Sequence, residues 1–320
     1  MSRVRDSAFV RVLVLVLSGV SLAGAVPAVL QAQELPDADV AGPVATVVLD
    51  ERVTTGSSAS SQGEAERREV ITLDGETGQV LRQERYAPRD TLHSRTTFEY
   101  DDAGRLVHVR SHDGDGVRLW RREYRYTASG DLEREISHGA TGLIELVTAY
   151  QYAAGQLEQV TQYRFGTEVL WRRIYRRDED GSLSWDLVGA EGERIRQVRQ
   201  RFDARQRPIL QQSFDQMGAI WEEIRHRYED GRHEVRRYGP GAQLLEQSLT
   251  RFDEWNNPVH QEVRRRDGEN DAVSAVTHEY RYDQNGNWVE RSTVHFGEDG
   301  QVTRRMEAIR RIEYSPGAGR

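Results

Sequence analysis

The stretch that decides the fold reads Phe98-Glu99-Tyr100-Asp101-Asp102-Ala103-Gly104-Arg105-Leu106, and it returns as Tyr280-Arg281-Tyr282-Asp283-Gln284-Asn285-Gly286-Asn287-Trp288. Looser copies lie between these two, and the anchor aromatics Tyr100, Tyr126 and Tyr152 stand 26 residues apart. A spacing that is kept over many copies marks a repeat architecture, in which each unit buries its apolar face against its neighbours. The sequence therefore predicts about nine units between residues 66 and 315, with a period of about 26 residues.

Each unit is predicted to be a β-hairpin. Trp120, Tyr124 and Tyr126 occupy alternate positions and would share one face of a strand, whereas a helix would need spacings of three and four. In the turn, an Asp at the first position and a Gly at the fourth suit a type I turn followed by a left-handed residue. Asn256 or Asn257 would replace the missing glycine, because Asn tolerates that conformation.

The Tyr-x-Tyr-Asp-x-x-Gly-x-Leu/Trp string resembles the YD repeat of the Rhs family over most of residues 66–315. This resemblance implies a strip of β-hairpins that can spiral into a shell, often around a C-terminal toxin, and it implies links to carbohydrate binding and the cell surface. The present unit is longer than the family's usual one, and the array is short for a large closed shell. Because the chain ends six residues after Tyr314, we do not expect a toxin-delivery role.

The predicted fold is all-β: a long antiparallel meander of tandem hairpins, with roughly 18 strands, in an open twisted or spiralling sheet. Residues 1–32 are predicted to be a signal peptide, because Arg3, Arg5 and Arg11 precede the apolar run 12–17 and small residues follow. An uncleaved membrane anchor is the alternative. Residues 33–65 are assigned to an N-terminal strand, near 44–53, and a flexible linker. Residues 66–315 form the hairpin-repeat domain, and 316–320 form a C-terminal tail.

The composition excludes several classes of protein. The 320 residues contain no cysteine, so disulfide scaffolds, zinc-thiolate sites and cysteine nucleophiles are ruled out. The net charge of -8 argues against a nucleic-acid partner.

His108 and His112 are four residues apart, but in a strand they would lie about 13 Å from each other, too far for one metal ion. We identify no metal site, no cofactor and no catalytic residue.

Aromatic residues are the candidate ligand-binding groups. Leu-Trp-Arg-Arg at 119–122 recurs at 170–173, and Ile-Trp-Glu-Glu follows at 220–223, so the tryptophans stand 51 and 50 residues apart. Aromatic rows on a sheet can stack on sugar rings or contact protein partners. The alternative is that they fill the concave or buried face. The candidates are Trp120, Trp171, Trp221, Tyr126 and Tyr152.

The leading functional hypothesis is an exported, non-catalytic repeat protein, periplasmic or extracellular, that binds or scaffolds a polysaccharide or an envelope protein. It would have no integral membrane span once the signal peptide is removed. A carbohydrate-active hydrolase with carboxylates on the sheet is a second hypothesis. An outer-membrane β-barrel is a third, although Arg122 would share the face of Trp120 and Tyr124, where such a barrel needs an apolar surface. The sequence does not specify the oligomeric state.

Overall fold

The computed structural model describes residues 40–55, 67–267 and 270–315, which form twenty β-strands and two short 3-10 turns. The predicted signal peptide, most of the predicted linker and the tail lie outside the described residues. The strands are β1 (Val44–Thr55), β2 (Arg67–Leu73), β3 (Val80–Ala87), β4 (Thr91–Tyr100), β5 (Leu106–Asp113), β6 (Arg118–Tyr126), β7 (Leu132–His138), β8 (Ile144–Ala153), β9 (Gln156–Arg164), β10 (Glu168–Arg177), β11 (Leu183–Gly189), β12 (Arg194–Phe202), β13 (Pro208–Phe214), β14 (Ile220–Glu229), β15 (Arg232–Tyr238), β16 (Leu244–Phe252), β17 (Pro258–Asp267), β18 (Asn270–Tyr282), β19 (Trp288–Phe296) and β20 (Val302–Tyr314). The 3-10 turns are η1 (Pro88–Asp90) and η2 (Pro240–Ala242).

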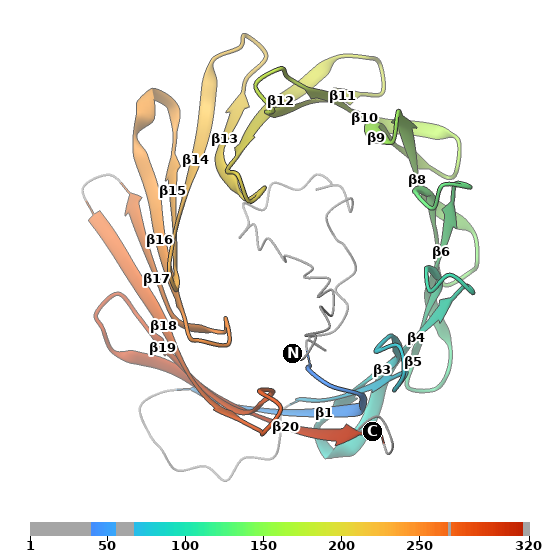
Figure 1. Cartoon of the computed structure of the whole chain (residues 1–320), viewed down its shortest axis with the longest axis vertical. Coiled ribbons are helices and arrows are strands. Elements are labelled where there is room, and N and C mark those ends of the chain that lie inside the picture. Colours follow the sequence, from blue (N-terminus) through green and yellow to red (C-terminus); the bar gives the residue numbers. More distant parts are fainter. Residues whose placement is uncertain (1–39, 56–66, 268–269, 316–320) are drawn as a thin grey trace, which may run out of the picture. The chain divides into compact units, whose positions relative to one another are not determined.

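The sheet closes on itself. Each strand pairs antiparallel with the next, and β1 pairs with both β2 and β20, through Val47↔Ile71 and Val47↔Ile312 (Figure 1). The result is an all-β, closed, 20-stranded barrel, in which none of the described strands is left at an edge. The prediction of an open twisted or spiralling sheet is therefore wrong. The hairpin pattern is a local property, whereas closure depends on pairing between the first and last strands.

The turns follow the chemistry that the sequence predicts. In the first clear motif turn, Gly104 N–H donates to the Asp101 carbonyl and Asp101 N–H donates to the Arg105 carbonyl, both at 2.9 Å. The Asp101 carboxylate accepts two further backbone N–H groups, from Ala103 and Arg105. Gly104 has φ +76°, and Asn256 takes the same left-handed position at φ +64°, as predicted.

An antiparallel meander places alternate turns at opposite ends of the barrel. One end, the motif rim, comprises the described turns at 74–79, 101–105, 127–131, 154–155, 178–182, 203–207, 230–231, 253–257 and 283–287. The other end, the inter-unit rim, includes the turns at 88–90, 113–117, 139–143, 165–167, 189–193, 215–219, 239–243 and 297–301. The two rims are therefore built from two different sets of turns in the repeat.

The register traces one face of the sheet around the whole barrel, because directly paired residues point to the same side. The face that contains Val47 on β1 and Ala308 on β20 carries most of the buried side chains, including Val160 and Val198. Curvature crowds side chains on the inside of a closed barrel and spreads them on the outside. This face is therefore the inner face, and alternate residues form the outer face.

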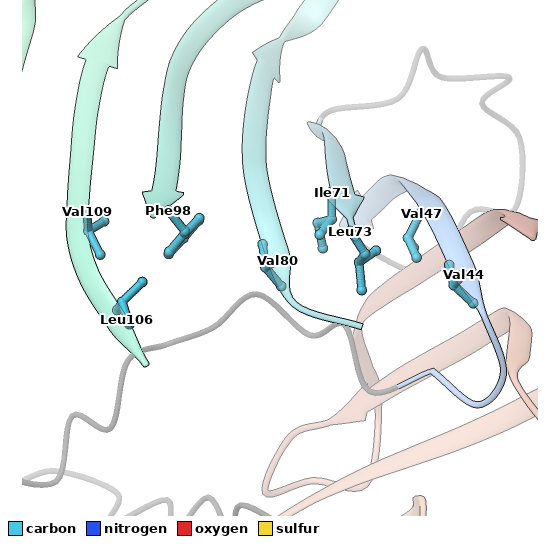
Figure 2. Close-up of a cluster of buried hydrophobic side chains, with 8 residues drawn as sticks. All are labelled: Val44, Val47, Ile71, Leu73, Val80, Phe98, Leu106 and Val109. Atoms are coloured by element: carbon cyan, nitrogen blue, oxygen red, sulfur yellow. The ribbon is translucent and has the colours of Figure 1, made fainter. Parts of the chain in front are cut away.

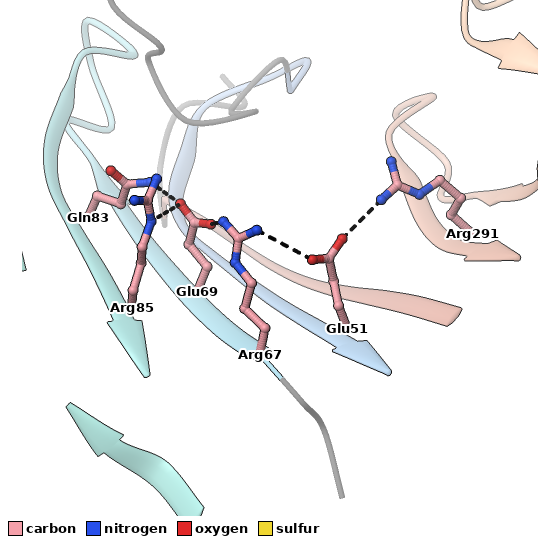
Figure 3. Close-up of polar contacts among 6 residues, drawn as sticks. All are labelled: Glu51, Arg67, Glu69, Gln83, Arg85 and Arg291. Atoms are coloured by element: carbon pink, nitrogen blue, oxygen red, sulfur yellow. Dashed lines mark hydrogen bonds and ion pairs between the residues drawn. The ribbon is translucent and has the colours of Figure 1, made fainter. Parts of the chain in front are cut away.

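A polar network crosses the inner face where the barrel closes (Figure 3). The buried carboxylate of Glu69 accepts a hydrogen bond from Gln83 and pairs with Arg67 at 2.8 Å. Arg67 lies 3.7 Å from Glu51, which also pairs with Arg291 at 3.1 Å. The figure shows these side chains converging on the concave side from β3, β2, β1 and β19. The network therefore links the first strands to the last.

Apolar side chains gather in the sector from β1 to β5. We call this set the aliphatic cluster, and Trp120 and Tyr124 pack against it. Figure 2 shows its eight buried members: Val44, Val47, Ile71, Leu73, Val80, Phe98, Leu106 and Val109.

Hydrogen bonds between units fix the repeat. Tyr100 OH donates to the Val80 carbonyl at 2.9 Å, and Tyr126 OH donates to the Leu106 carbonyl at 2.7 Å, so both tyrosines reach the preceding unit. The last motif turn, 283–287, instead binds the segment just before β1 and so helps to close the barrel. Asn287 exchanges two hydrogen bonds with the Ala41 backbone and donates to Tyr314 OH.

Candidate functional site

Two of the predicted tryptophans, Trp171 on β10 and Trp221 on β14, lie on the inner face. The strands that carry them bound one sector of the barrel in Figure 1. Trp171 is opposite Gln162 on β9, and its Nε1–H donates to the Gln162 side chain at 3.0 Å. Trp221 lies at a bulge at the start of β14, and the guanidinium of Arg196 lies over its ring at 4.6 Å. The structure thus brings these two candidates to the same side of the sheet, within a few strands of each other.

A third tryptophan and two arginines complete the group. The Arg173 guanidinium lies 4.4 Å from the ring of Trp185 and 6.0 Å from the ring of Trp171. The register places Arg173 opposite Leu187, and Leu187 opposite Arg196, on the inner face. We call these five residues the Trp–Arg cluster: Trp171, Arg173, Trp185, Arg196 and Trp221.

The positive charges of the Trp–Arg cluster are not matched by carboxylates at ion-pair distance among the described residues. Arg173 is only 8% exposed, and its Nε has no hydrogen-bond partner, although its Nη1 donates to Tyr175 OH at 3.2 Å. Burial lowers the pKa of Arg196; Glu222 opposes this shift and Arg173 adds to it. Glu222 itself pairs with Arg237 at 2.7 Å. Two guanidinium groups are therefore held here by aromatic rings, without an ion pair of their own among the described residues.

The other three candidates lie elsewhere on the same face. Trp120 on β6 packs against the aliphatic cluster, with Arg122 at 5.2 Å from its ring. The Tyr126 hydroxyl donates to the Leu106 carbonyl of the preceding unit, and the guanidinium of Arg105 lies 4.8 Å from the centre of the Tyr126 ring. Tyr152 on β8 is half-buried, and burial raises the pKa of its hydroxyl. These residues fill the inner face, and the structure does not join them to the Trp–Arg cluster.

Sequence reasoning missed Trp185, Arg173 and Arg196 as site residues. Arg173 belongs to the repeated Leu-Trp-Arg-Arg string, and its place two residues after Trp171 could have marked it. Trp185 and Arg196 lie on other strands, and only the register brings them together. The apparent 50-residue series is also irregular, because Trp120 and Trp171 follow a bulge whereas Trp221 is the bulge residue itself.

The outer face carries ladders of opposite charge. Arg121 and Glu123 on β6 pair at 2.8 Å, and β14 and β15 repeat the pattern with Arg225–Glu223 and Arg236–Glu234, each at 2.6 Å. A shallow hollow of about 550 Å³ lies beside these last two pairs. Its two carboxylates are each bound to an arginine, which suits a solvated charge ladder better than a proton donor.

A histidine pair lies on the inner face at β14 and β15. His226 Nδ1 and His233 Nε2 are 3.2 Å apart, and Tyr228 stacks on His233. Burial lowers the pKa of His226 to about 4, with a smaller contribution from His233. Among the described residues there is no cluster of three or more potential metal ligands.

No helix within the described ranges is long and apolar enough to cross a membrane.

No protein-family model and no curated protein matches the sequence. Among solved structures, the chain is similar to a porin-like protein from Bacteroides uniformis, at 11% identity and a TM-score of 0.35, over 85% of this chain and 98% of that one. A porin-like protein from Bacteroides vulgatus matches at 15% identity and a TM-score of 0.27, over 77% and 97% of the two chains. The TcdB2-TccC3 protein, without its hypervariable C-terminal region, matches at 12% identity and a TM-score of 0.34, over 80% of this chain and 15% of that one. Likenesses of this strength carry no argument about function.

Proposed function

We propose that the protein is an exported, non-enzymatic binding protein of the cell envelope, and that the inner face of its barrel binds a polysaccharide at the Trp–Arg cluster. The observation that carries this proposal is the combination of Trp221 and Trp185 with Arg173 and Arg196, two arginines that form no ion pair within the described part of the chain. Aromatic rings stack on the apolar faces of sugars, and guanidinium groups bind carboxylates in a bidentate way. The ligand class is therefore an acidic polysaccharide.

The export and the family assignment are part of the same proposal. The basic and apolar pattern of residues 1–32 supports export to the periplasm or the outside of the cell. The motif turns and the tyrosines that bind the preceding unit support descent from a YD-like hairpin repeat. A closed barrel of such hairpins presents the same residues on its inner face that an open strip would present on one side.

Binding to polygalacturonate and to neutral dextran, measured by isothermal titration calorimetry, tests the proposal. We expect polygalacturonate to bind at least tenfold more tightly. Trp221→Ala and Arg196→Gln should each weaken this binding at least tenfold, because they remove a stacking ring and a carboxylate partner. The control is Trp255→Ala, since Trp255 is an exposed tryptophan of the motif rim. Equal affinity for both glycans would refute the preference for acidic sugars, and no binding to either would refute the proposed function.

Two other functions have less support. A transmembrane barrel needs an apolar outer face, and each arginine facing lipid at mid-membrane costs about 2–4 kcal/mol. Here β6 alone directs Arg121, Glu123 and Arg125 outward. A glycoside hydrolase needs one carboxylic acid held protonated beside a carboxylate. In the hollow on the outer face, both carboxylates are paired with arginine.

A further inference from the structure

The large exposed apolar side chains of the barrel gather at one end. Among the described residues, eleven large hydrophobic side chains are exposed, and eight of these lie in inter-unit turns or within the first two residues of the strand that follows. We call these eight the apolar arc: Val117, Leu119, Leu143, Ile144, Phe165, Ile195, Met217 and Ile220.

The apolar arc is contiguous. Its members come from five consecutive inter-unit turns, between β5 and β14, in the teal-to-gold sector of Figure 1. The neighbouring described turns of the same rim, 88–90 and 239–243, contribute no large exposed hydrophobic side chain. Successive turns are two strands apart, about 10 Å, so the arc is about 40 Å long. Contiguous exposed apolar surface of this kind marks an interaction site.

The side chains of the apolar arc are highly exposed, and one of them, Phe165, has a backbone conformation that bulky residues rarely adopt. Leu143 is 72% exposed, Phe165 67% and Met217 92%. Phe165 has φ +51° at the first central position of the 164–167 turn, which Thr167 N–H closes by donating to the Arg164 carbonyl, and Asn is usual at such a position. A bulky residue in this left-handed region costs about 1–3 kcal/mol. The fold therefore keeps an exposed aromatic ring where a polar residue would be more stable.

Arginine side chains tie adjacent turns of the arc together. Arg118 donates to the Ala140 carbonyl at 3.1 Å, joining the β5–β6 turn to the β7–β8 turn. Arg194 donates to the Gln216 carbonyl at 3.4 Å, joining the β11–β12 turn to the β13–β14 turn. Such a pre-organised surface can bind a partner with little further loss of conformational entropy.

The charge around the arc is acidic. The segments 113–118, 139–145, 189–194 and 215–220 each carry one net negative charge, and 164–168 is neutral. The exposed turn residues include Asp115 and Glu191. An anionic membrane surface would be repelled by this charge, and a second copy of the arc would bring like charges together. A positively charged partner is complementary.

We propose that the apolar arc is the docking surface for a cationic, amphipathic helical segment of a partner protein, laid across the five turns. The arc follows the curved rim of a closed barrel, so the straight distance between its end turns is about 30 Å, and a helix of about 20 residues spans it. Its apolar side chains would cover the exposed turn tips, and its basic flanks would meet the acidic segments. This surface lies at the rim, whereas the Trp–Arg cluster lies on the inner face, and the two adjoin where Ile195 and Ile220 directly precede Arg196 and Trp221.

The probe is a fluorescent 20-residue amphipathic peptide of Leu and Arg, with a Leu and Glu peptide of the same pattern as its counterpart. We expect the purified protein to bind the cationic peptide and not the anionic one, by fluorescence anisotropy. The triple variant Leu143→Ser/Phe165→Asn/Met217→Ser should lose at least tenfold in affinity. Asn at 165 suits the left-handed backbone. The matched control is Leu81→Ser/Ile309→Ser, which removes exposed apolar side chains outside the arc.

A charge variant tests the proposed attraction between the acidic segments of the rim and the basic partner, and it leaves the apolar residues unchanged. Asp115→Asn/Glu191→Gln should weaken peptide binding and reduce its salt dependence. Unchanged peptide affinity in the triple variant would overturn the proposal. Binding to phosphatidylcholine or phosphatidylglycerol vesicles that the triple variant loses would also overturn it, in favour of a membrane. Self-association that the triple variant loses, seen by sedimentation velocity, would overturn it in favour of a second copy.

Discussion

The sector from β1 to β5 and the sector from β10 to β14 face the same barrel interior but fill it differently. In the first, valine, leucine, isoleucine and phenylalanine side chains pack into the aliphatic cluster. In the second, tryptophan rings hold arginine side chains through cation–π contacts. Both sectors are made of the same hairpin unit, and both continue the same antiparallel ladder.

The difference shows that the repeat needs a filled inner face but does not dictate how it is filled. Aliphatic burial stabilises by removing apolar area from water, at about 25 cal/mol per Å². A guanidinium on a desolvated ring contributes about 2 kcal/mol, but it retains a charge that can bind an anion. The first sector is therefore suited to stability and the second to recognition.

The largest expected effect comes from the aliphatic cluster. Phe98→Ala should lower the free energy of unfolding by about 3–5 kcal/mol, because it leaves a cavity among buried side chains. Guanidinium chloride denaturation measures this change. Phe165→Asn is the comparison variant and should not lower the free energy of unfolding, because that ring is exposed and Asn suits the left-handed backbone. A loss below about 1 kcal/mol for Phe98→Ala would contradict the assignment of this cluster as the core.

Arg173→Met should have a smaller effect on stability than Phe98→Ala and a large effect on binding. Removing a buried guanidinium that has no ion pair offsets the lost cation–π contact, so unfolding should change by less than about 1 kcal/mol. Affinity for polygalacturonate should fall at least tenfold. The comparison variant is Arg122→Met, which deprives the buried carboxylate of Glu135 of its 3.7 Å partner and should cost about 1–3 kcal/mol. Similar stability losses in the two variants would contradict the distinction between Arg122, which has a carboxylate partner, and Arg173, which has none among the described residues.

The smallest expected effect is a pH dependence from the histidine pair. Burial lowers the pKa of His226 to about 4 and also lowers that of His233, so the folded state binds fewer protons than the unfolded state between pH 6.5 and 4. Stability should be fully present above about pH 6.5 and should fall as the pH drops towards 4. Melting temperatures between pH 7.5 and 4.5 measure this slope. His226→Gln/His233→Gln should reduce this slope but not abolish it, because burial also lowers the pKa of His278 to about 4. A slope unchanged by the two substitutions would assign it to other groups.

Much of the local structure could be predicted from the sequence. Asp101 and Gly104 predict the motif turn, and of the two residues expected to replace glycine, Asn256 or Asn257, the structure places Asn256 in the left-handed position. The alternation of Trp120, Tyr124 and Tyr126 predicts strands, and the strand expected near 44–53 is β1. The candidate site was predicted only in part. Trp171 and Trp221 belong to one cluster, whereas the partners Trp185 and Arg196 lie on β11 and β12, at positions that only the register can align.

The sequence by itself determined the hairpin unit, the chemistry of its turns and the residues of each strand that share a face. These features depend on neighbours within a few residues, where turn preferences and side-chain alternation act. Only the tertiary structure decided that the sheet closes, because closure adds up the tilt and stagger of twenty strands before β1 can meet β20. Closure also separated a crowded inner face from a charged outer face. It set the exposed turns of five units in one arc.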